Sequence, residues 1–291
     1  MRTIEQYGFA KINLHLDVAG RRYDGFHTVK TVMQSLSLCD KIALTPRNDG
    51  KFTVSCNVSG VPLDASNLAV RAAMAYAKVK GLKFGVDIVI DKNIPMAAGL
   101  AGGSADAAAV LKIMRQIDGG AMPIARLYGI ASDLGSDVPF CIAGGTALGE
   151  GKGDVLRPLS GMPDCTVVVA CGNESVSTPM AYSMLDDKYN GFAKGIYEPR
   201  STAALKRALD DGDIFGVAIN MYNIFEEPIS SVRPEVRQIK EIMLGGGAIG
   251  AMMSGSGPSV FGIFTDDALA QKTVERLKTL GIFACTCNPQ N

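Results

Sequence analysis

The sequence predicts a two-domain α+β protein. Its 291 residues are 47% hydrophobic and 20% charged, a globular composition long enough for one large or two medium domains. The pattern of strands and helices begins afresh near residues 158–164, so we place one domain over residues 1–160 and a second over residues 161–291. The order β-α-β-β-α-β in the second domain predicts a ferredoxin-like unit.

The first domain begins with strands. Residues 11–18 alternate strictly, as in a half-buried strand. One face carries Ile12, Leu14, Leu16 and Val18, and the other carries Lys11, Asn13, His15 and Asp17. An Asp-Gly turn follows, and further strands are expected over residues 41–46, 51–56 and 86–92.

Three helices are predicted in the same domain. The first, over residues 67–80, ends at Gly81 and has an apolar stripe formed by Leu68, Ala72, Ala75 and Val79. The second has an apolar stripe formed by Ala107, Val110, Leu111, Met114 and Ile117. The third begins at Pro123 and ends at Gly135. Residues 137–154 are expected to return to strands and turns.

The second domain contains an uncharged segment as long as a membrane span, residues 242–265. It holds seven glycines, a proline and three serines, which suit turns between short strands better than a lipid-facing helix. The elements expected in this domain are strands at 165–170, 248–253, 259–264 and 283–287, and helices from Thr178, from Thr202, over 234–244 and over 266–281.

Charge and cysteine content exclude several partners. Lys plus Arg and Asp plus Glu number 29 each, so no bulk field attracts nucleic acid or an anionic membrane. The N-terminal segment has Glu5 and no long apolar run, so no signal or transit peptide is expected. Seven scattered cysteines and two histidines predict reduced thiols in a cytoplasmic protein, without a structural metal site. No obligate protein partner is indicated.

The stretch "PMAAGLAGGSADAAAVL", Pro95 to Leu111, joins a predicted strand to a predicted helix. A helix N-terminus presents N–H groups and a positive dipole end to phosphate, and glycines allow close approach of the backbone. A Gly/Ala-rich turn can equally serve only close helix packing. The P-loop, dinucleotide-binding and protein-kinase signatures are absent, so any nucleotide is bound by another route.

Three segments together resemble the GHMP kinases. "PMAAGLAGGSADAA" is similar to their signature P-x3-G-L-x-G-G-S-[SA]-x-A-A, "AKINLHL" to their first motif and "SGSGPSVFGIF" to their third. The resemblance spans Ala10 to Phe264. It implies a first domain like ribosomal protein S5 domain 2, a ferredoxin-like second domain, and ATP as co-substrate with Mg²⁺.

The resemblance also implies which residues contact the nucleotide. The matching positions are Pro95, Met96, Ala97, Ala98, Gly99, Leu100, Ala101, Gly102, Gly103, Ser104 and Ala105. Asn67 and Lys92, on either side, are implied to contact adenosine. Ser104 is also the candidate ligand of Mg²⁺, whose remaining ligands are commonly phosphate oxygens and water.

The same resemblance assigns catalytic and substrate-binding roles. Asp137, in "LGSDVPF", is implied to be the general base on the acceptor hydroxyl, and Lys11 the cation beside it that offsets transition-state charge. Asn13, two residues along the same strand face, is implied to bind substrate.

Four further segments are most similar to the GHMP kinases that phosphorylate a cytidyl-diphosphate substrate. They are "GRRYDGFHTVKTV", "NLAVRAA", "LGSDVPFCIAGGTALGEGKGD" and "STPMAY". His27 is then implied to hydrogen-bond the cytosine edge, with Phe26 and Tyr182 stacking on the ring. "GKGD" departs from the usual Gly-Ile/Val-Gly-Glu at Lys152 and Asp154, which puts local contacts in question.

Ordinary structural explanations stand beside these assignments. Asp137 could be a turn carboxylate, Lys11 a solvated charge and His27 a polar residue after a turn. Asn67 suits a helix N-cap, Lys92 the end of a strand, and Tyr182 a helical core position.

Two rival functions remain open at this level. One is a GHMP kinase for another small alcohol such as homoserine or mevalonate, for which Phe26, His27 and Tyr182 would have no purpose. The other is a non-catalytic ATP-binding sensor, against which the retention of both Lys11 and Asp137 argues.

Overall fold

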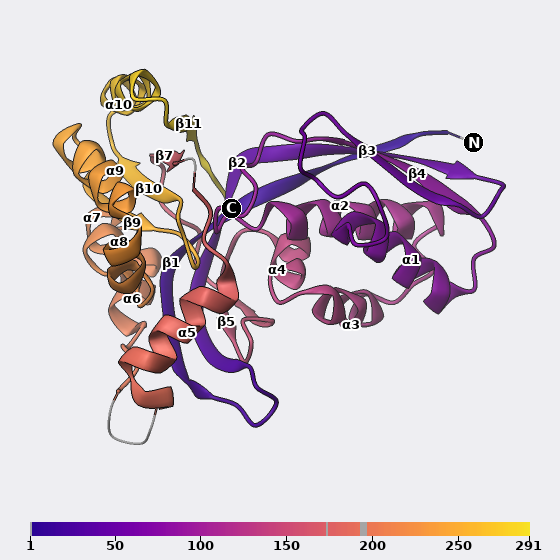
Figure 1. The fold of residues 1–291 in the computed structure, drawn as a ribbon, viewed down its shortest axis with the longest axis horizontal. Helices are drawn as coiled ribbons and strands as arrows, with labels where there is room; N and C mark the ends of the chain where they lie inside the picture. The colour runs from indigo at the N-terminus through magenta and orange to yellow at the C-terminus, as the bar shows by residue number, and fades with distance from the viewer. Residues whose placement is uncertain (1, 173, 193–196) are drawn as a thin grey trace. The chain divides into compact units, whose positions relative to one another are not determined.

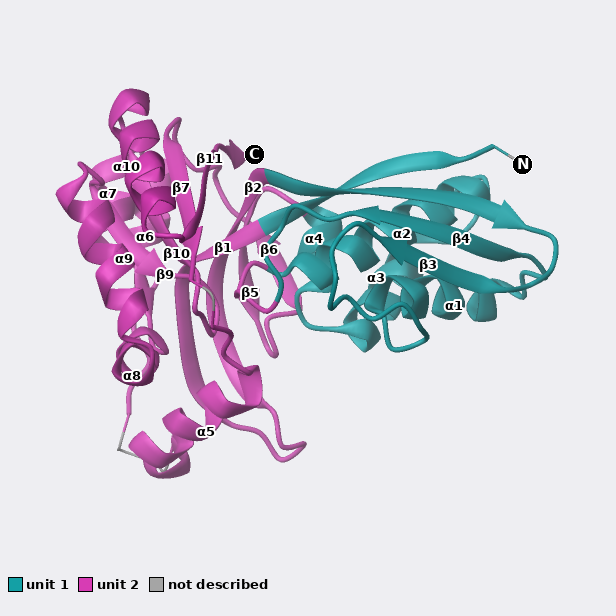
Figure 2. Ribbon diagram, turned by 45° about the horizontal axis from the view of Figure 1, so that its top comes forward, with its two compact units in different colours: residues 1–10, 38–96, 101–143 teal, residues 11–37, 97–100, 144–291 magenta. Residues whose placement is uncertain are grey.

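The computed structural model describes residues 2–172, 174–192 and 197–291 (Figure 1). They divide into two compact units: unit 1 comprises residues 1–10, 38–96 and 101–143, and unit 2 comprises residues 11–37, 97–100 and 144–291 (Figure 2). Two long strands, β1 (Ile4–Arg21) and β2 (His27–Arg47), contribute to both units. The α+β class is confirmed, while the domain boundary near residue 160 stays a prediction.

Unit 1 is a layer of strands covered on one face by helices (Figure 1). Strand β4 pairs in parallel with β3 and antiparallel with residues 41–47 of β2. The elements of this unit are β3 (Phe52–Cys56), α1 (Leu68–Lys80), β4 (Gly85–Asp91), α2 (Gly102–Ile117), α3 (Ile124–Leu134) and α4 (Val138–Ala143). Its core is formed where the apolar faces of α1 and α2 meet Ile88 and Ile90 of β4.

Two expectations for unit 1 need correction. Of the four residues expected on the apolar stripe of α1, Ala72 is buried, and Leu68 and Ala75 pack against the core from partly buried positions, but Val79 is 41% exposed. Alanines lie around most of this helix and blur its period, so the large residue Tyr76 is a better guide to the buried face. Residues 138–143 form helix α4 instead of a strand, because Pro139 suits a first helical turn.

Unit 2 contains the ferredoxin-like sheet that the order of elements predicts. Its strands lie in the order β11-β7-β10-β9 with antiparallel neighbours. These strands are β7 (Thr166–Cys171), β9 (Gly250–Met253), β10 (Val260–Phe264) and β11 (Phe283–Cys287). Helices α9 (Pro234–Gly245) and α10 (Asp267–Thr279) pack on the sheet.

The remaining elements of unit 2 are mostly short. They are β5 (Thr146–Glu150), β6 (Val155–Pro158), α5 (Thr178–Lys188), a 3₁₀ turn (Asn190–Phe192), α6 (Ala203–Asp210), α7 (Ile214–Ile219), β8 (Tyr222–Asn223), α8 (Glu226–Val232) and β12 (Pro289–Gln290). The uncharged segment 242–265 runs from the end of α9 through β9 and β10, as its turn residues predict. In the described part of the chain, no helix has both the length and the apolar character needed to cross a membrane.

Candidate active site

The polar face of β1 is buried, although an alternating strand usually turns such a face to water. Lys11 is 4% exposed, Asn13 3%, His15 1% and Asp17 0%. Burial, aided by Lys30 and Arg200, lowers the pKa of His15 to about 4, so this imidazole is neutral at pH 7. A row of buried polar side chains needs partners to offset its lost hydration.

Lys11 finds its partners in unit 2 beside the glycine-rich stretch. Its ammonium donates to Asn13 Oδ1 at 2.8 Å and to the carbonyl oxygen of Gly99 at 3.1 Å. Its backbone N–H donates to Leu100 at 3.1 Å, and Asn13 in turn donates to Thr31 Oγ1 at 2.8 Å. The strand therefore holds a cation against the loop that the sequence assigns to phosphate.

Gly99 is bare because another backbone lies against it. A Cβ atom there would lie 2.2 Å from the carbonyl oxygen of Ser254, and its φ of +78° disfavours any other residue. Ser254 Oγ also donates to the Gly99 carbonyl at 3.1 Å, and the Ser259 N–H donates to Ala98 at 3.2 Å. At this glycine the backbone is bare for close packing, although the partner is the loop after β9 and not a helix.

Gly103 has no such explanation. It lies in the first turn of α2, and a Cβ atom built on it would meet nothing within 4 Å. The helix begins after Ala101 without a side-chain cap, so Ser104 does not act as the cap. An uncapped helix N-terminus with open space beside it is an arrangement that accepts an anionic group.

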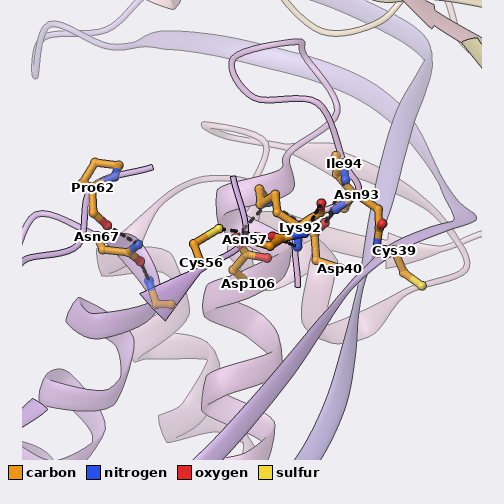
Figure 3. Close-up of polar contacts among 11 residues, drawn as sticks. Cys39, Asp40, Cys56, Asn57, Pro62, Asn67, Lys92, Asn93, Ile94 and Asp106 are labelled. Atoms are coloured by element: carbon orange, nitrogen blue, oxygen red, sulfur yellow. Dashed lines mark hydrogen bonds and ion pairs between the residues drawn. The ribbon is translucent and has the colours of Figure 1, made fainter. Parts of the chain in front are cut away.

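A buried ion cluster joins the two ends of the glycine-rich stretch within unit 1 (Figure 3). The Lys92 ammonium lies between Asp40, with which it forms a short ion pair, and Asp106 of α2 at 2.9 Å. The second oxygen of Asp40 accepts the backbone N–H groups of Asn93 at 2.6 Å and Ile94 at 2.8 Å. The charges thus tie the end of β4 to the beginning of α2.

The cluster holds one more carboxyl group than cations. Burial raises the pKa of Asp106 to about 7; Lys92 opposes that shift and Asp40 adds to it. Burial alone would lower the pKa of Lys92, but Asp106 and Asp40 outweigh it, so the net direction is upward. Gly102 leaves room for the ammonium, because a Cβ atom on this residue would lie 3.0 Å from Lys92 Nζ.

Two other predicted residues lie at the starts of helices. Asn67 caps α1, accepting from the N–H of Ala69 at 2.9 Å while its amide donates to Pro62 at 2.7 Å (Figure 3). Asp137 lies immediately before α4, where its carbonyl oxygen accepts from the Cys141 N–H at 3.0 Å.

The structure brings together two of the three predicted base-binding residues. The rings of His27 and Tyr182 stack with centroids 4.6 Å apart and planes 26° apart. Phe26 is 57% exposed, and the ammonium of Lys152 lies 5.2 Å from its ring centroid. The departure at "GKGD" therefore contacts a residue that the resemblance assigns to the substrate.

Sequence reasoning missed Asp186, whose Oδ1 lies 2.8 Å from His27 Nε2. It is four residues after Tyr182 on α5, so helical spacing could have placed both on one face. It also missed Thr31, Asp40 and Asp106, which carry no local signal of their own.

Family models match both halves of the chain. The model of the GHMP kinases N-terminal domain matches residues 67–145, and that of the GHMP kinases C-terminal domain matches residues 202–282. The chain belongs to the GHMP kinase family. The first match contains Asn67, the glycine-rich stretch and Asp137, and the second contains the loop after β9.

Within the GHMP kinase family, the chain is similar to several individual kinases. The chain is 40% identical over 280 residues to the 4-diphosphocytidyl-2-C-methyl-D-erythritol kinase of Alkaliphilus metalliredigens, covering 96% of this chain and 94% of that one. A crystal structure of 4-(cytidine 5'-diphospho)-2C-methyl-D-erythritol kinase matches with a TM-score of 0.82 and 31% identity, covering 99% of this chain and 100% of that one. A homoserine kinase from Cytophaga hutchinsonii, at 21% identity and a TM-score of 0.72, covers 100% of this chain and 95% of that one and shares the fold.

The ion cluster predicts a pH-dependent stability for this GHMP kinase. With its pKa raised from the ordinary 3.8 to about 7, Asp106 binds a proton more readily folded than unfolded, so its contribution to stability falls as pH rises between these values. The Asp106→Asn variant has no carboxyl group to titrate at this position, so its stability does not fall with pH for this reason. Urea unfolding at pH 5 and pH 8 should show the variant gaining at least about 1 kcal/mol on the wild type at the higher pH.

Asp133→Asn, an exposed change on α3, controls for the loss of one surface charge. A difference between Asp106→Asn and the wild type that is the same at both pH values would contradict the raised pKa of Asp106.

Proposed function

We propose that this GHMP kinase transfers the γ-phosphoryl group of ATP to the 2-hydroxyl of 4-diphosphocytidyl-2-C-methyl-D-erythritol, a step in non-mevalonate isoprenoid precursor synthesis. The observation that carries phosphoryl transfer is the Lys11 ammonium held on the Gly99 carbonyl. The substrate rests on the name of relatives that cover nearly the whole chain and is supported by the stacked His27–Tyr182 pair.

We propose that ATP lies with its phosphates at the N-terminus of α2. The open space at Gly103 and the uncapped first turn support this position. The stretch Pro95–Ala105 would present backbone N–H groups to the phosphates. Asn67 would act on the adenosine side through the start of α1, because its own amide is engaged by Ala69 and Pro62. Lys92 would act through the stretch whose ends it holds, since its ammonium is engaged by Asp40 and Asp106.

Magnesium fits this arrangement as a companion of the nucleotide. Among residues 2–172, 174–192 and 197–291, no group of three or more His, Cys, Asp or Glu side chains could hold a metal ion. Bound Mg²⁺ neutralises charge on transferring phosphates and takes most of its ligands from phosphate and water. Ser104, in the first turn of α2, is the hydroxyl we propose beside it.

Asp137 is the proposed general base. The substrate hydroxyl oxygen attacks the γ-phosphorus, its proton passes to the Asp137 carboxylate, and the bond to the departing ADP breaks. Lys11 stabilises the charge that develops on the transferring group, while Asn13 orients the ammonium and the substrate. No covalent enzyme intermediate is involved.

The two substrates, ATP and the cytidyl-diphosphate alcohol, are the proposed partners, with no nucleic acid or membrane. We place the reaction in the cytoplasm. All seven cysteines carry free thiols, which suits a reducing compartment.

The substrate assignment is tested by coupled ADP release. We expect turnover with 4-diphosphocytidyl-2-C-methyl-D-erythritol and none above background with homoserine or mevalonate.

The role of Asp137 is tested by the Asp137→Asn variant. This variant should lower kcat at least about 100-fold while the ATP dissociation constant stays within about twofold, because the base acts only on the acceptor. Preference for homoserine or mevalonate would favour the rival kinases, and wild-type turnover in Asp137→Asn would remove its role as base.

The phosphate position is tested by one methyl group. Gly103→Ala should leave stability unchanged or slightly raised, since alanine favours a helix and meets nothing in the protein, yet raise the KM for ATP about tenfold or more by occupying ligand space. Gly129→Ala is the matched control, because it is also a helical glycine whose Cβ would meet nothing within 4 Å. Equal KM values in both variants would show that phosphate does not approach Gly103.

A further inference from the structure

The proposed mechanism does not use the carboxylate of Asp186, which contacts a ring nitrogen of His27. Asp186 Oδ1 is 2.8 Å from His27 Nε2, and the two residues are 159 positions apart in the chain. The side chain of His27 is 7% exposed and that of Asp186 is 24% exposed, so the pair is largely buried but still reached by solvent at Asp186. Because the contact joins α5 to the start of β2, local turn geometry does not explain it.

The ring of His27 is held in one orientation. Tyr182 covers one face at 4.6 Å, and Phe192 approaches at 5.8 Å with planes 69° apart. Tyr182 is itself packed edge-on against Phe225 at 4.9 Å. With its face and Nε2 engaged, the ring would meet a ligand through its Nδ1 edge.

Asp186 decides the chemistry of that edge. An ionised carboxylate only accepts hydrogen bonds, so Nε2 must carry a hydrogen to contact it. A neutral imidazole has one ring hydrogen, which leaves Nδ1 as an acceptor. Asp186, at the Nε2 edge of the ring, therefore determines which tautomer His27 adopts.

We propose that Asp186 is a positioning residue for base specificity: by holding the hydrogen of His27 on Nε2, it makes Nδ1 the acceptor for the 4-amino group of cytosine. Uracil carries an oxygen acceptor at that position and would face Nδ1 with two lone pairs opposed. The kinase then selects cytidyl over uridyl substrates at this contact. The inference rests on the proposed function and deepens it.

A purely structural ion pair would have a different signature. If Asp186 only fastened α5 to β2, its loss would weaken both substrates to the same extent. The cytosine-to-uracil ratio of kcat/KM separates the two accounts, because a general loosening of the site leaves that ratio unchanged.

The test compares wild type, Asp186→Asn and Asp187→Asn with the cytidyl substrate and its uridyl counterpart. Asparagine can donate to Nε2 or accept from it, so it releases the tautomer without a large change in shape. We expect the wild type to favour cytidyl about 100-fold, and Asp186→Asn to lower that ratio about tenfold or more with kcat on saturating cytidyl substrate within about twofold. Asp187→Asn, the exposed neighbour on α5, should keep the wild-type ratio.

A second variant guards against misfolding. Asp186→Glu keeps the carboxylate and should restore most of the preference that Asp186→Asn loses. An unchanged ratio in Asp186→Asn, or equal losses on both substrates, would overturn the inference while leaving the proposed function intact. A wild type that neither turns over the cytidyl substrate nor binds CDP more tightly than UDP in calorimetry would instead remove the proposed function.

Discussion

The carbonyl oxygen of Gly99 is the point on which unit 2 depends. It accepts from Lys11 Nζ of β1 and from Ser254 Oγ of the loop after β9, so one backbone atom joins three distant segments. The approach is reciprocal, because a Cβ atom on Gly255 would lie 2.9 Å from the same oxygen. A buried ammonium needs such acceptors to offset lost hydration, and only glycine leaves room for them.

The buried ion cluster of unit 1 also holds backbone segments in place, and its contribution to stability is secondary. Asp40, Lys92 and Asp106 are all buried, and buried ion pairs repay their desolvation only with good geometry. What the cluster provides is attachment: Asp40 of β2 binds the backbone of Asn93 and Ile94, and Lys92 joins Asp40 to Asp106 of α2. Gly103 is left uncrowded between these anchored segments, and this open space is where we propose that the ATP phosphates lie.

Local periodicity was sufficient for much of the fold and little of the site. The alternation in residues 11–18 assigned the two faces of β1, and the order of elements predicted the ferredoxin-like sheet. It could not show that Lys11 and Asn13 are buried, because the covering groups come from β2 and the glycine-rich stretch. Asp186 was missed for a similar reason, since its partner lies 159 residues away. Family resemblance supplied the roles, and long-range contacts show what holds each residue in place.

The central claim is that backbone packing at Gly99 holds the cation and the loop together. Gly119 is the comparison, because its φ of +67° is also left-handed but its Cβ would meet nothing within 4 Å. Urea unfolding of Gly119→Ala should cost about 1 kcal/mol for the backbone alone. Gly99→Ala should cost at least about 2 kcal/mol more and lower kcat at least about tenfold, because the added carbon displaces Ser254 and with it the Lys11 contact. Equal costs at the two glycines, with kcat unchanged, would contradict the account.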